Sequence, residues 1–349
     1  MAERALVVAG PRELAFEDIA TGELPVGAVR VRTLYSGISA GTELSQYRGT
    51  SPFMHRQWDV ANRVFRDGEP SWSYPVRNLG YEEVGEIVET GSAVNRLRVG
   101  QRVFGTWGHR TGHVMSEADA LDRLMPEGAD PRIGIFSHIG AVALNGVHDA
   151  QIRIGDLVVV FGLGVPGQIA AQAARASGAT VVGVDPVASR RELALKLGAD
   201  RVLDPTAVSV SDTIKSETGG RGADVCIEVS GAATALAEAM RTVAYASRVV
   251  ALGFFQGEAR GLMLGEEFHH NRIEVISSQI SGVAPAVSHR WSKLRLWQSA
   301  VRLQHEGRLS LMPLITDTVP FAEAPALFAR LDKGDPAIMQ SVLNFGDIS

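Results

Sequence analysis

The sequence has a single cysteine, Cys226, so an internal disulfide is excluded. Cys226 lies within the apolar run Ala223–Val229, which indicates a small core residue rather than a nucleophile. A chain without disulfides is typical of a reducing compartment, so we expect a cytoplasmic protein. The opening stretch MAERALVVAGPREL has acidic residues and no sustained apolar core, so no secretory leader is expected.

Long apolar runs are also missing, although 45% of the 349 residues are hydrophobic. No stretch approaches the roughly 20 apolar residues of a membrane span, so no membrane partner is expected. Positive charge is not in excess either. The formal net charge is −5 and no basic block stands out, which argues against nucleic acid as the main partner. The length is sufficient for two domains with separate cores.

Glycine is abundant, and three glycines follow a short apolar run. The run Leu157–Phe161 predicts a buried parallel strand, and Gly162, Gly164 and Gly167 follow with the spacing G-x-G-x-x-G. In such a motif the first glycine permits a tight turn, the second lets the backbone approach a pyrophosphate, and the third lets the helix lie close on its strand. The helix N-terminus then faces the phosphates. The residues between the glycines complete the expected nucleotide-binding turn: Leu163, Val165 and Pro166.

A second predicted strand, Thr180–Val184, ends in the acidic residue Asp185. A carboxylate at this position accepts hydrogen bonds from the adenosine ribose and repels a 2′-phosphate, which favours NAD over NADP. Arg190 and Arg191 follow closely and keep NADP open as an alternative.

The chain up to about residue 132 predicts an irregular, mostly antiparallel β domain, because short strands alternate with glycine and proline. The expected strands are Ala5–Val8, Ala28–Leu34, Gly85–Glu89, Gln101–Gly105 and His113–Ser116. A long insertion, Pro52–Asn78, is rich in aromatic and charged residues, and we expect a helix over His55–Phe65. Long insertions of this kind are often lids or binding loops.

From about Asp130 to His289 strands alternate with helices, which predicts a doubly wound parallel sheet. An edge strand, Ile273–Ser277, is expected to pair in a homodimer. The other expected elements are helices Ala188–Leu197, Val210–Glu217 and Ala233–Ala244, and strands Arg201–Leu203, Asp224–Glu228 and Arg248–Leu252. We expect the segments from Trp291 onward to belong to the first domain. We therefore expect a catalytic domain of residues 1–133 and 290–349 around a nucleotide-binding domain of residues 134–289.

The order of these motifs resembles the medium-chain dehydrogenase/reductase superfamily, in its zinc alcohol dehydrogenase-like group. The likeness is carried by SGISAGTE (Ser36–Glu43), GYEEVGEIVETG (Gly80–Gly91), VGQRV (Val99–Val103), FGLGVPG (Phe161–Gly167), DPVASRRELALKLGAD (Asp185–Asp200) and PLITDTVPFAEAPALFARLDKG (Pro313–Gly334). The resemblance implies an α/β protein with a GroES-like β-rich catalytic domain, a Rossmann domain and a cofactor cleft between them. It also implies further contacts with NAD from Ser230, Gly231, Gly253, Phe254, Ser278 and Gln279. Arg190, close after Asp185 in the chain, is a further candidate for cofactor binding.

Departures from the family concern zinc. Zinc-dependent members present a cysteine in G-x-C-G-x-D, a histidine in GHE and a third ligand before the Rossmann strand. Here Ser39 and Tyr81 stand nearest the first two positions, and the third region reads Ser137-His138. We therefore expect no catalytic zinc, and the missing cysteines exclude the structural zinc of many relatives. The SGIS-x-GTE and GYE variants are most similar to a branch that includes the hydroxyethyl dehydrogenase of the bacteriochlorophyll pathway.

Tyr81 is the first candidate to replace the metal. A phenol can hydrogen-bond an alcohol or alkoxide, and a neighbouring cation would lower its pKa. The alternative is a tyrosine that only fills the vacated metal space. Thr42 matches the hydroxyl residue that relays the substrate proton in the family. The alternative to this catalytic role is a structural one, in which the Thr42 hydroxyl stabilises a turn or caps a helix.

Glu43 and Glu82 match acidic residues of the family's metal shell. Without a metal they could pair with an arginine, orient Tyr81 or hold substrate hydroxyls, and the alternative is a structural ion pair. His138 could act as general base or as the cation beside Tyr81, and the alternative is a structural imidazole. His109 and His113 are further candidates for a catalytic role, whereas His269 and His270 are expected at the surface of the domain.

The expected function is a zinc-independent, NAD-dependent dehydrogenase that transfers a hydride between NAD and a small-molecule secondary alcohol. The alcohol would be a cyclic polyol, a sugar-like compound or a larger hydroxylated metabolite. One alternative is a zinc-free quinone or enoyl reductase of the same superfamily, and Asp185 counts against it because those enzymes usually take NADPH. The other is a non-catalytic protein that binds NAD, and the titratable groups expected at the site argue against it.

Overall fold

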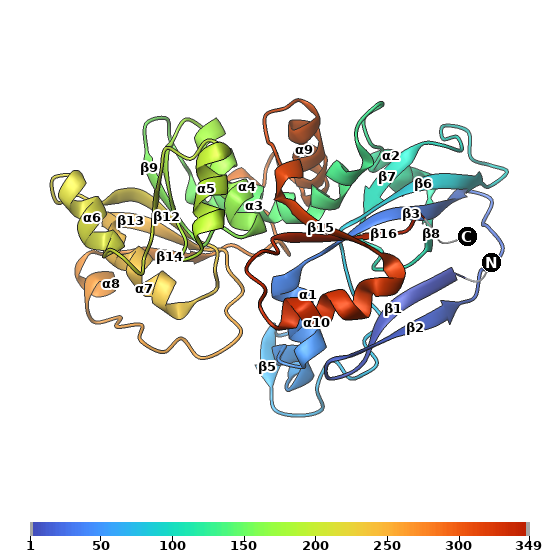
Figure 1. The fold of residues 1–349 in the computed structure, drawn as a ribbon, viewed down its shortest axis with the longest axis horizontal. Coiled ribbons are helices and arrows are strands. Elements are labelled where there is room, and N and C mark those ends of the chain that lie inside the picture. The colour runs from blue at the N-terminus through green and yellow to red at the C-terminus, as the bar shows by residue number, and fades with distance from the viewer. Residues whose placement is uncertain (1–2, 347–349) are drawn as a thin grey trace. The chain divides into compact units, whose positions relative to one another are not determined.

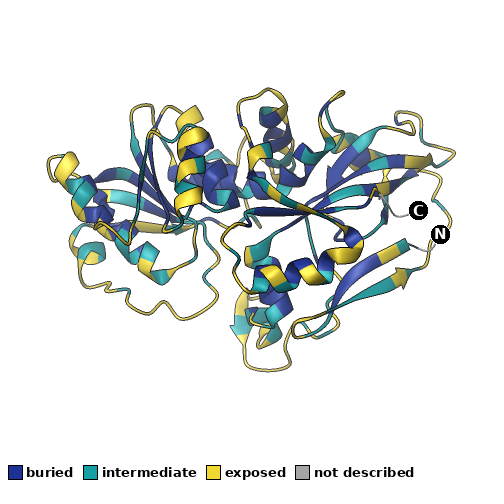
Figure 2. Cartoon of the chain, in the orientation of Figure 1, coloured by how far each residue is buried: buried dark blue, intermediate teal, exposed yellow. Residues whose placement is uncertain are grey.

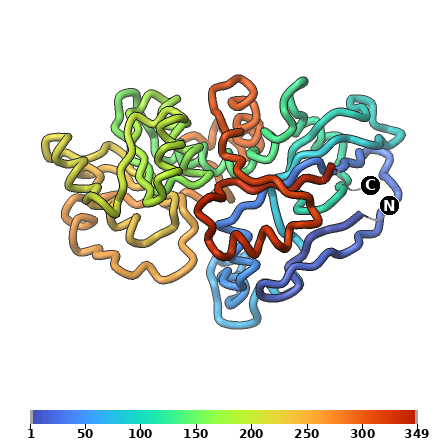
Figure 3. The backbone as a smooth tube through the Cα atoms, viewed as in Figure 1, coloured from blue at the N-terminus to red at the C-terminus, as the bar shows by residue number. Residues whose placement is uncertain are grey.

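The computed structural model describes residues 3–346, which divide into two compact units. The first contains the residues up to His138 together with those from Met312 onward, and the second is Ile139–Leu311. The N-terminal and C-terminal segments of the chain thus share one unit (Figure 3). The sequence pattern places the boundaries near residues 133 and 290, whereas the contacts group helix α9 (Lys293–His305) with the second unit.

The first unit is built on a six-stranded sheet in the order β15-β16-β3-β6-β7, with β8 pairing to β3 (Figure 1). Every pairing in it is antiparallel except that of β15 with β16, so the predicted β-rich domain is confirmed. Its strands are β3 (Ala28–Ile38), β6 (Glu83–Thr90), β7 (Arg102–Gly105), β8 (Gly112–Ser116), β15 (Ile315–Pro320) and β16 (Gln340–Asn344), and a separate hairpin is formed by β1 (Glu3–Gly10) and β2 (Glu13–Ile19).

Helices cover this sheet where apolar side chains need burial. The helices are α1 (Ala40–Arg48), α2 (Glu117–Asp122), α10 (Ala324–Asp332) and the start of α3 (Phe136–Ala150). Helix α1 lies beside α10 (Figure 1), and the rings of Tyr47 and Phe328 meet at 5.6 Å between them. This apolar contact fixes α1 at the end of β3, which is where the SGISAGTE segment begins.

The expected helix over His55–Phe65 is wrong. The segment instead forms a short hairpin of β4 (Gln57–Asp59) and β5 (Val64–Arg66). Its turn is made by the carboxylate of Asp59, which accepts the backbone N–H of Asn62 at 3.0 Å, and by Arg63, which adopts a φ of 55°. Local hydrogen bonding of this kind competes directly with helix formation.

The second unit contains a six-stranded parallel sheet in the order β11-β10-β9-β12-β13-β14, so the predicted doubly wound fold is confirmed. Its strands are β9 (Leu157–Phe161), β10 (Thr180–Val184), β11 (Arg201–Leu203), β12 (Ala223–Glu228), β13 (Val243–Ala251) and β14 (Glu274–Ser277). The strand order reverses between β9 and β12. Sheets of this type bind ligands at the carboxyl ends of the strands beside such a reversal.

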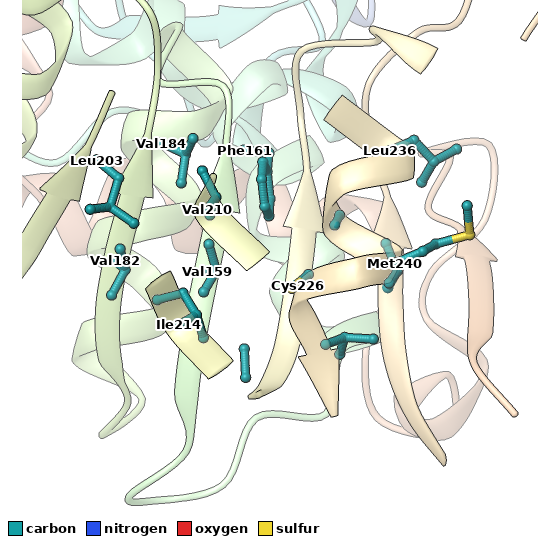
Figure 4. Close-up of a cluster of buried hydrophobic side chains, with 14 of the residues drawn as sticks. Val159, Phe161, Val182, Val184, Leu203, Val210, Ile214, Cys226, Leu236 and Met240 are labelled. Atoms are coloured by element: carbon teal, nitrogen blue, oxygen red, sulfur yellow. The ribbon is translucent and has the colours of Figure 1, made fainter. Parts of the chain in front are cut away.

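Helices α6 (Val210–Glu217) and α7 (Ala233–Thr242) pack on one face of this sheet (Figure 4). Cys226 is fully buried in their core, as its apolar surroundings predict. Strands β9 and β12 are buried along most of their length (Figure 2). Strand β13 begins at Val243, directly after α7, rather than at the expected Arg248. The remaining helices are α4 (Val165–Ala176), α5 (Ala188–Lys196) and α8 (Glu267–His270).

The hydropathy and length of the helices were compared with those of membrane-spanning helices. Within residues 3–346, none combines the length and the apolar character that a bilayer crossing requires.

Candidate active site

The glycine turn after β9 has the geometry that the sequence predicts. Gly162 adopts a φ of 92°, in the left-handed region, and Gly164 is the N-cap of α4. A Cβ at Gly167 would overlap the carbonyl oxygen of Gly162, so the helix lies directly on the turn. A Cβ at Gly164 would meet nothing within 4 Å. The open space beside free helix N–H groups suits an anionic ligand that approaches the backbone closely.

Asp185 is held rigidly against this turn. Its Oδ2 accepts the N–H of Leu163 at 2.8 Å and its Oδ1 accepts the N–H of Val187 at 2.8 Å. The guanidinium of Arg191 is bound to Asp204 at 2.9 Å, whereas that of Arg190 lies 3.9 Å from Asp185. The carboxylate is therefore fixed where an adenosine ribose would lie in a Rossmann domain.

Loops at the carboxyl ends of β12 and β13 bring together several residues expected at the cofactor. Glu228 accepts the N–H of Ser230 at 2.7 Å and that of Gly231 at 3.1 Å. A Cβ at Gly253 would come within 2.7 Å of Gly231, so these two loops touch. Glu228 is a residue that sequence reasoning missed, and its only signal is an acidic residue at the end of a buried strand. The other expected residues lie nearby in the chain, with Phe254 after β13 and Ser278 and Gln279 after β14.

The first unit carries a separate group of hydroxyls, Ser39, Thr42 and Tyr81, which we call the hydroxyl cluster. The phenol of Tyr81 donates to Ser39 Oγ at 2.5 Å and is also hydrogen-bonded with the Thr42 hydroxyl. The ring of His138 lies 4.7 Å from that of Tyr81, centroid to centroid. All four residues are intermediate between buried and exposed. The structure therefore brings together the predicted tyrosine, threonine and histidine.

Beneath the hydroxyl cluster lies a buried layer of acidic side chains. Glu43 is 1% exposed, and Glu82 and Glu83 are fully buried. Glu82 accepts from the Gln340 side chain at 3.3 Å, and Glu43 lies 2.7 Å from His109 Nε2. Within residues 3–346, neither glutamate forms an ion pair with an arginine, which was one of the expected alternatives. Because of their burial, they act on a solute only through their neighbours.

Burial also decides the ionisation of these groups. It raises the pKa of Tyr81 above its ordinary value, and the charge of Glu82 adds to this effect. The expected lowering of this pKa by a neighbouring cation is therefore wrong, and Tyr81 is a neutral phenol. Burial likewise raises the pKa of Glu82 well above its ordinary value and that of Glu83 to about 7.

A raised carboxyl pKa makes stability depend on pH. The folded protein binds the Glu83 proton more tightly than the unfolded chain, whose pKa is near 4.5, so the stabilisation is complete below pH 4.5 and is lost as the pH rises through about 7. The loss amounts to about 3 kcal/mol in the free energy of unfolding. We expect Glu83→Gln to reduce the difference in urea stability between pH 5 and pH 8.

The control for that experiment is Glu86→Gln, which alters a partly exposed carboxylate on the same strand. It should leave the difference between pH 5 and pH 8 at its parental size. An unchanged difference in Glu83→Gln as well would contradict the assignment.

Two of the three positions that hold zinc ligands in the family carry hydroxyl groups here, and the third region contains an imidazole. Zinc is bound by thiolate, imidazole and carboxylate groups. Here the corresponding donors are the hydroxyls of Ser39 and Tyr81, which hydrogen-bond each other, and the region of Ser137 and His138. Within residues 3–346, no three His, Cys, Asp or Glu side chains are placed to hold a metal ion together.

Comparison with known proteins places this site in a family. The alcohol dehydrogenase GroES-like domain family matches residues 26–143, and the zinc-binding dehydrogenase family matches residues 166–298. D-guloside 3-dehydrogenase of Escherichia coli K12 is 35% identical over 334 residues, which cover 94% of this chain and 95% of that protein. The chain belongs to the zinc-type, medium-chain alcohol dehydrogenase family. Its GroES-like and Rossmann domains are the two units described above.

Other family members extend the comparison. Sorbitol dehydrogenase of Halalkalibacterium halodurans is 26% identical over 88% of this chain and 89% of that protein. The crystal structure of a Sinorhizobium meliloti dehydrogenase bound to NADP has a TM-score of 0.78 at 22% identity, covers 99% of both chains, and supports the fold. Medium-chain dehydrogenases use a nicotinamide cofactor, and the chain is an oxidoreductase acting on CH–OH groups.

Proposed function

We propose that this medium-chain dehydrogenase oxidises a secondary hydroxyl of a sugar-like or cyclic polyol substrate with NAD, and that it does so without zinc. The observation that carries the proposal is the hydroxyl cluster, in which Tyr81 donates to Ser39 beside Thr42 at the family's metal position. When bound, the cofactor supplies the hydride acceptor. The residues of the chain have to bind the alcohol and manage its proton.

The neutral phenol of Tyr81 defines how the proton is handled. In the direction of ketone reduction, Tyr81 turns its proton from Ser39 Oγ to the oxygen that becomes the alcohol, and the hydroxyls of Ser39 and Thr42 then donate to the phenol oxygen that has lost its proton. In the direction of oxidation, the alcohol proton passes to the phenol oxygen as the phenol proton passes to Ser39 Oγ, and Ser39 releases its own hydroxyl proton to the group that finally takes it up. His138 lies beside Tyr81 and is the proposed acceptor or donor that completes the transfer.

The substrate class rests on the relatives together with the character of the site. D-guloside 3-dehydrogenase and sorbitol dehydrogenase are named for hydroxyl-rich substrates. Hydroxyl groups on the protein can donate to and accept from substrate hydroxyls, which an apolar pocket cannot do. These properties support a sugar-like or polyol alcohol in place of a simple aliphatic one.

A substrate screen tests this proposal. Glycosides, cyclic polyols and linear polyols would be supplied with NAD or NADP, and the corresponding ketones with NADH or NADPH, while absorbance at the nicotinamide band is followed. Turnover of at least one glycoside or polyol with NAD is expected. Turnover confined to quinones or enoyl compounds with NADPH would replace the proposal with the reductase alternative. Nucleotide binding without any turnover would favour a non-catalytic role.

The preference for NAD is proposed from Asp185. Its carboxylate lies beside the glycine turn, held by the N–H groups of Leu163 and Val187, where it would repel a 2′-phosphate. We expect Asp185→Ala to reduce the ratio of NADPH to NADH dissociation constants by about tenfold or more. Fluorescence titration with both nucleotides measures the ratio.

Asp200→Ala is the matched control, because the Asp200 carboxylate likewise accepts a backbone N–H in the same unit, that of Val181 at 2.9 Å. It should leave the nucleotide ratio unchanged. Equal affinities of the parental protein for NADH and NADPH would refute the proposed preference.

We also propose a homodimer that pairs through β14. This strand lies at the edge of the parallel sheet, and Glu274, Val275 and Ser277 are exposed on it. Exposed edges of this kind are normally covered or paired. Sedimentation at micromolar concentration should give a dimer, and a monomer would count against the pairing.

A further inference from the structure

His109 is a buried histidine that joins several segments of the first unit. It lies in the loop between β7 and β8 and is 1% exposed. Its backbone N–H donates to the carbonyl of Leu79 at 2.9 Å, and its carbonyl accepts the N–H of Leu6 at 2.9 Å. The position of the ring is therefore set by the fold rather than by solvent.

Both ring nitrogens of His109 have hydrogen-bond partners. Nε2 lies 2.7 Å from Oε2 of Glu43, and Nδ1 lies 2.6 Å from Oγ of Ser36. The Ser36 hydroxyl donates its one proton to Oε1 of Glu83 at 2.9 Å. When the Glu83 carboxylate is ionised, Ser36 can only accept from Nδ1, and the Glu43 carboxylate can only accept from Nε2, so both ring nitrogens then carry protons.

Electrostatics agree with a doubly protonated ring. Burial alone would lower the pKa of His109, but the charge and hydrogen bond of Glu43, together with the charge of Glu83, outweigh it and raise the pKa. The groups that face the ring are Glu43 from α1, Glu83 from β6 and the ring of Phe328 from α10, at 6.3 Å. An imidazolium at 2.7 Å from the Glu43 carboxylate pairs a charge that would otherwise be buried alone.

The His109 ring supports both partners of the Tyr81–Ser39 hydrogen bond. On one side, the Glu43 carboxylate that it holds accepts the backbone N–H of Ser39 through Oε1 at 2.8 Å. On the other side, the ring packs on Gly80, where a Cβ would come within 2.7 Å of it and where φ is 93°. Gly80 directly precedes Tyr81 in the chain, so the imidazole contacts the backbone that presents the phenol.

On the basis of the proposed dehydrogenase function, we propose that His109 is a positioning residue for the hydroxyl cluster. As an imidazolium clamped between Ser36 and Glu43, it holds Ser39 through Glu43 and Tyr81 through the backbone of Gly80. It does not contact the substrate. Its role is to keep the phenol and the serine hydroxyl at the separation that proton transfer needs. Small displacements of reacting groups at such a site lower the reaction rate strongly.

Two substitutions with one control test this role by kinetics. His109→Phe keeps a ring and removes both N–H groups, so kcat should fall roughly tenfold or more while KM and NADH affinity change less than about twofold. His109→Gln can still donate one N–H to Glu43 and should recover part of that loss. His113→Gln makes the same change at a histidine that stacks on Trp107 outside this cluster, and should keep the parental kcat. Parental kcat in both His109 variants, with only a lower melting temperature, would reduce His109 to a structural residue.

Nuclear magnetic resonance supplies a readout that is independent of turnover. In the parental protein labelled with [15N]histidine, His109 should show protons on both ring nitrogens at neutral pH, and an unprotonated Nε2 would overturn the proposal. In protein labelled with [13Cζ]tyrosine, the Tyr81 signal, assigned by its loss in Tyr81→Phe, should shift in His109→Gln and stay in place in His113→Gln. A parental protein without dehydrogenase activity would refute the proposed function, and these spectra would still decide the position of His109.

Discussion

Replacing Tyr81 by phenylalanine is expected to lower kcat by roughly 10²- to 10⁴-fold, which is the usual contribution of general acid–base assistance. The substitution keeps the ring, including its contact with His138 at 4.7 Å, and deletes only the oxygen that donates to Ser39. It therefore separates chemistry from space filling. Steady-state kinetics with the best substrate of the screen measure the effect, and KM should change little by comparison.

Tyr74→Phe is the matched control for this prediction. The Tyr74 hydroxyl donates to the carbonyl of Gln46 at 2.9 Å in the same unit but lies outside the hydroxyl cluster. Its loss should leave kcat near the parental value. NADH affinity should stay unchanged in both variants, because neither residue belongs to the nucleotide turn. Parental turnover by Tyr81→Phe would show that Tyr81 only packs, and His138 would be the next residue to test.

Two alanine substitutions in the glycine turn are expected to act in different ways. In Gly167→Ala the new Cβ would overlap the carbonyl oxygen of Gly162, so the backbone has to move and the second unit should lose at least about 1 to 3 kcal/mol of stability. In Gly164→Ala the Cβ would meet nothing within 4 Å and φ is −69°, so stability should change by less than about 0.5 kcal/mol.

Binding of NADH distinguishes the two variants further. The space at Gly164 is where a pyrophosphate would approach the backbone, so Gly164→Ala should weaken NADH binding about tenfold or more while leaving the fold intact. Thermal unfolding and fluorescence titration measure the two effects separately. A Gly164→Ala variant that binds NADH as tightly as the parent would place the nucleotide elsewhere.

The second unit could be predicted from sequence because its signals are local. Apolar runs such as Leu157–Phe161 are followed by glycines, and each strand is separated from the next by a helix-length segment. The elements of the first unit were harder to predict from the sequence. Helix α1 contains glycine, serine and threonine, which have low helix propensity, and it is held by packing on α10 rather than by its own sequence. The β4–β5 hairpin was mistaken for a helix because its turn depends on the side chain of Asp59.

Sequence motifs were sufficient to predict which residues of the hydroxyl cluster and its neighbourhood lie close together. Tyr81, Thr42 and His138 were expected near one another from the family pattern, and the structure brings them together. The role of His109 could not be foreseen, because its partners Glu43 and Glu83 lie on other elements far away in the chain. The direction of the Tyr81 pKa was also beyond sequence reasoning, since burial and neighbouring carboxylates decide it.

We propose that hydroxyl chemistry at Tyr81 replaces zinc in this dehydrogenase. The most direct measurement is the rate of NAD reduction, with the best glycoside or polyol of the screen, by protein exhaustively treated with a chelator and analysed for bound metal. We expect less than stoichiometric zinc and a rate equal to that of untreated protein. One zinc per chain, with activity lost in chelator and restored by added zinc, would contradict it.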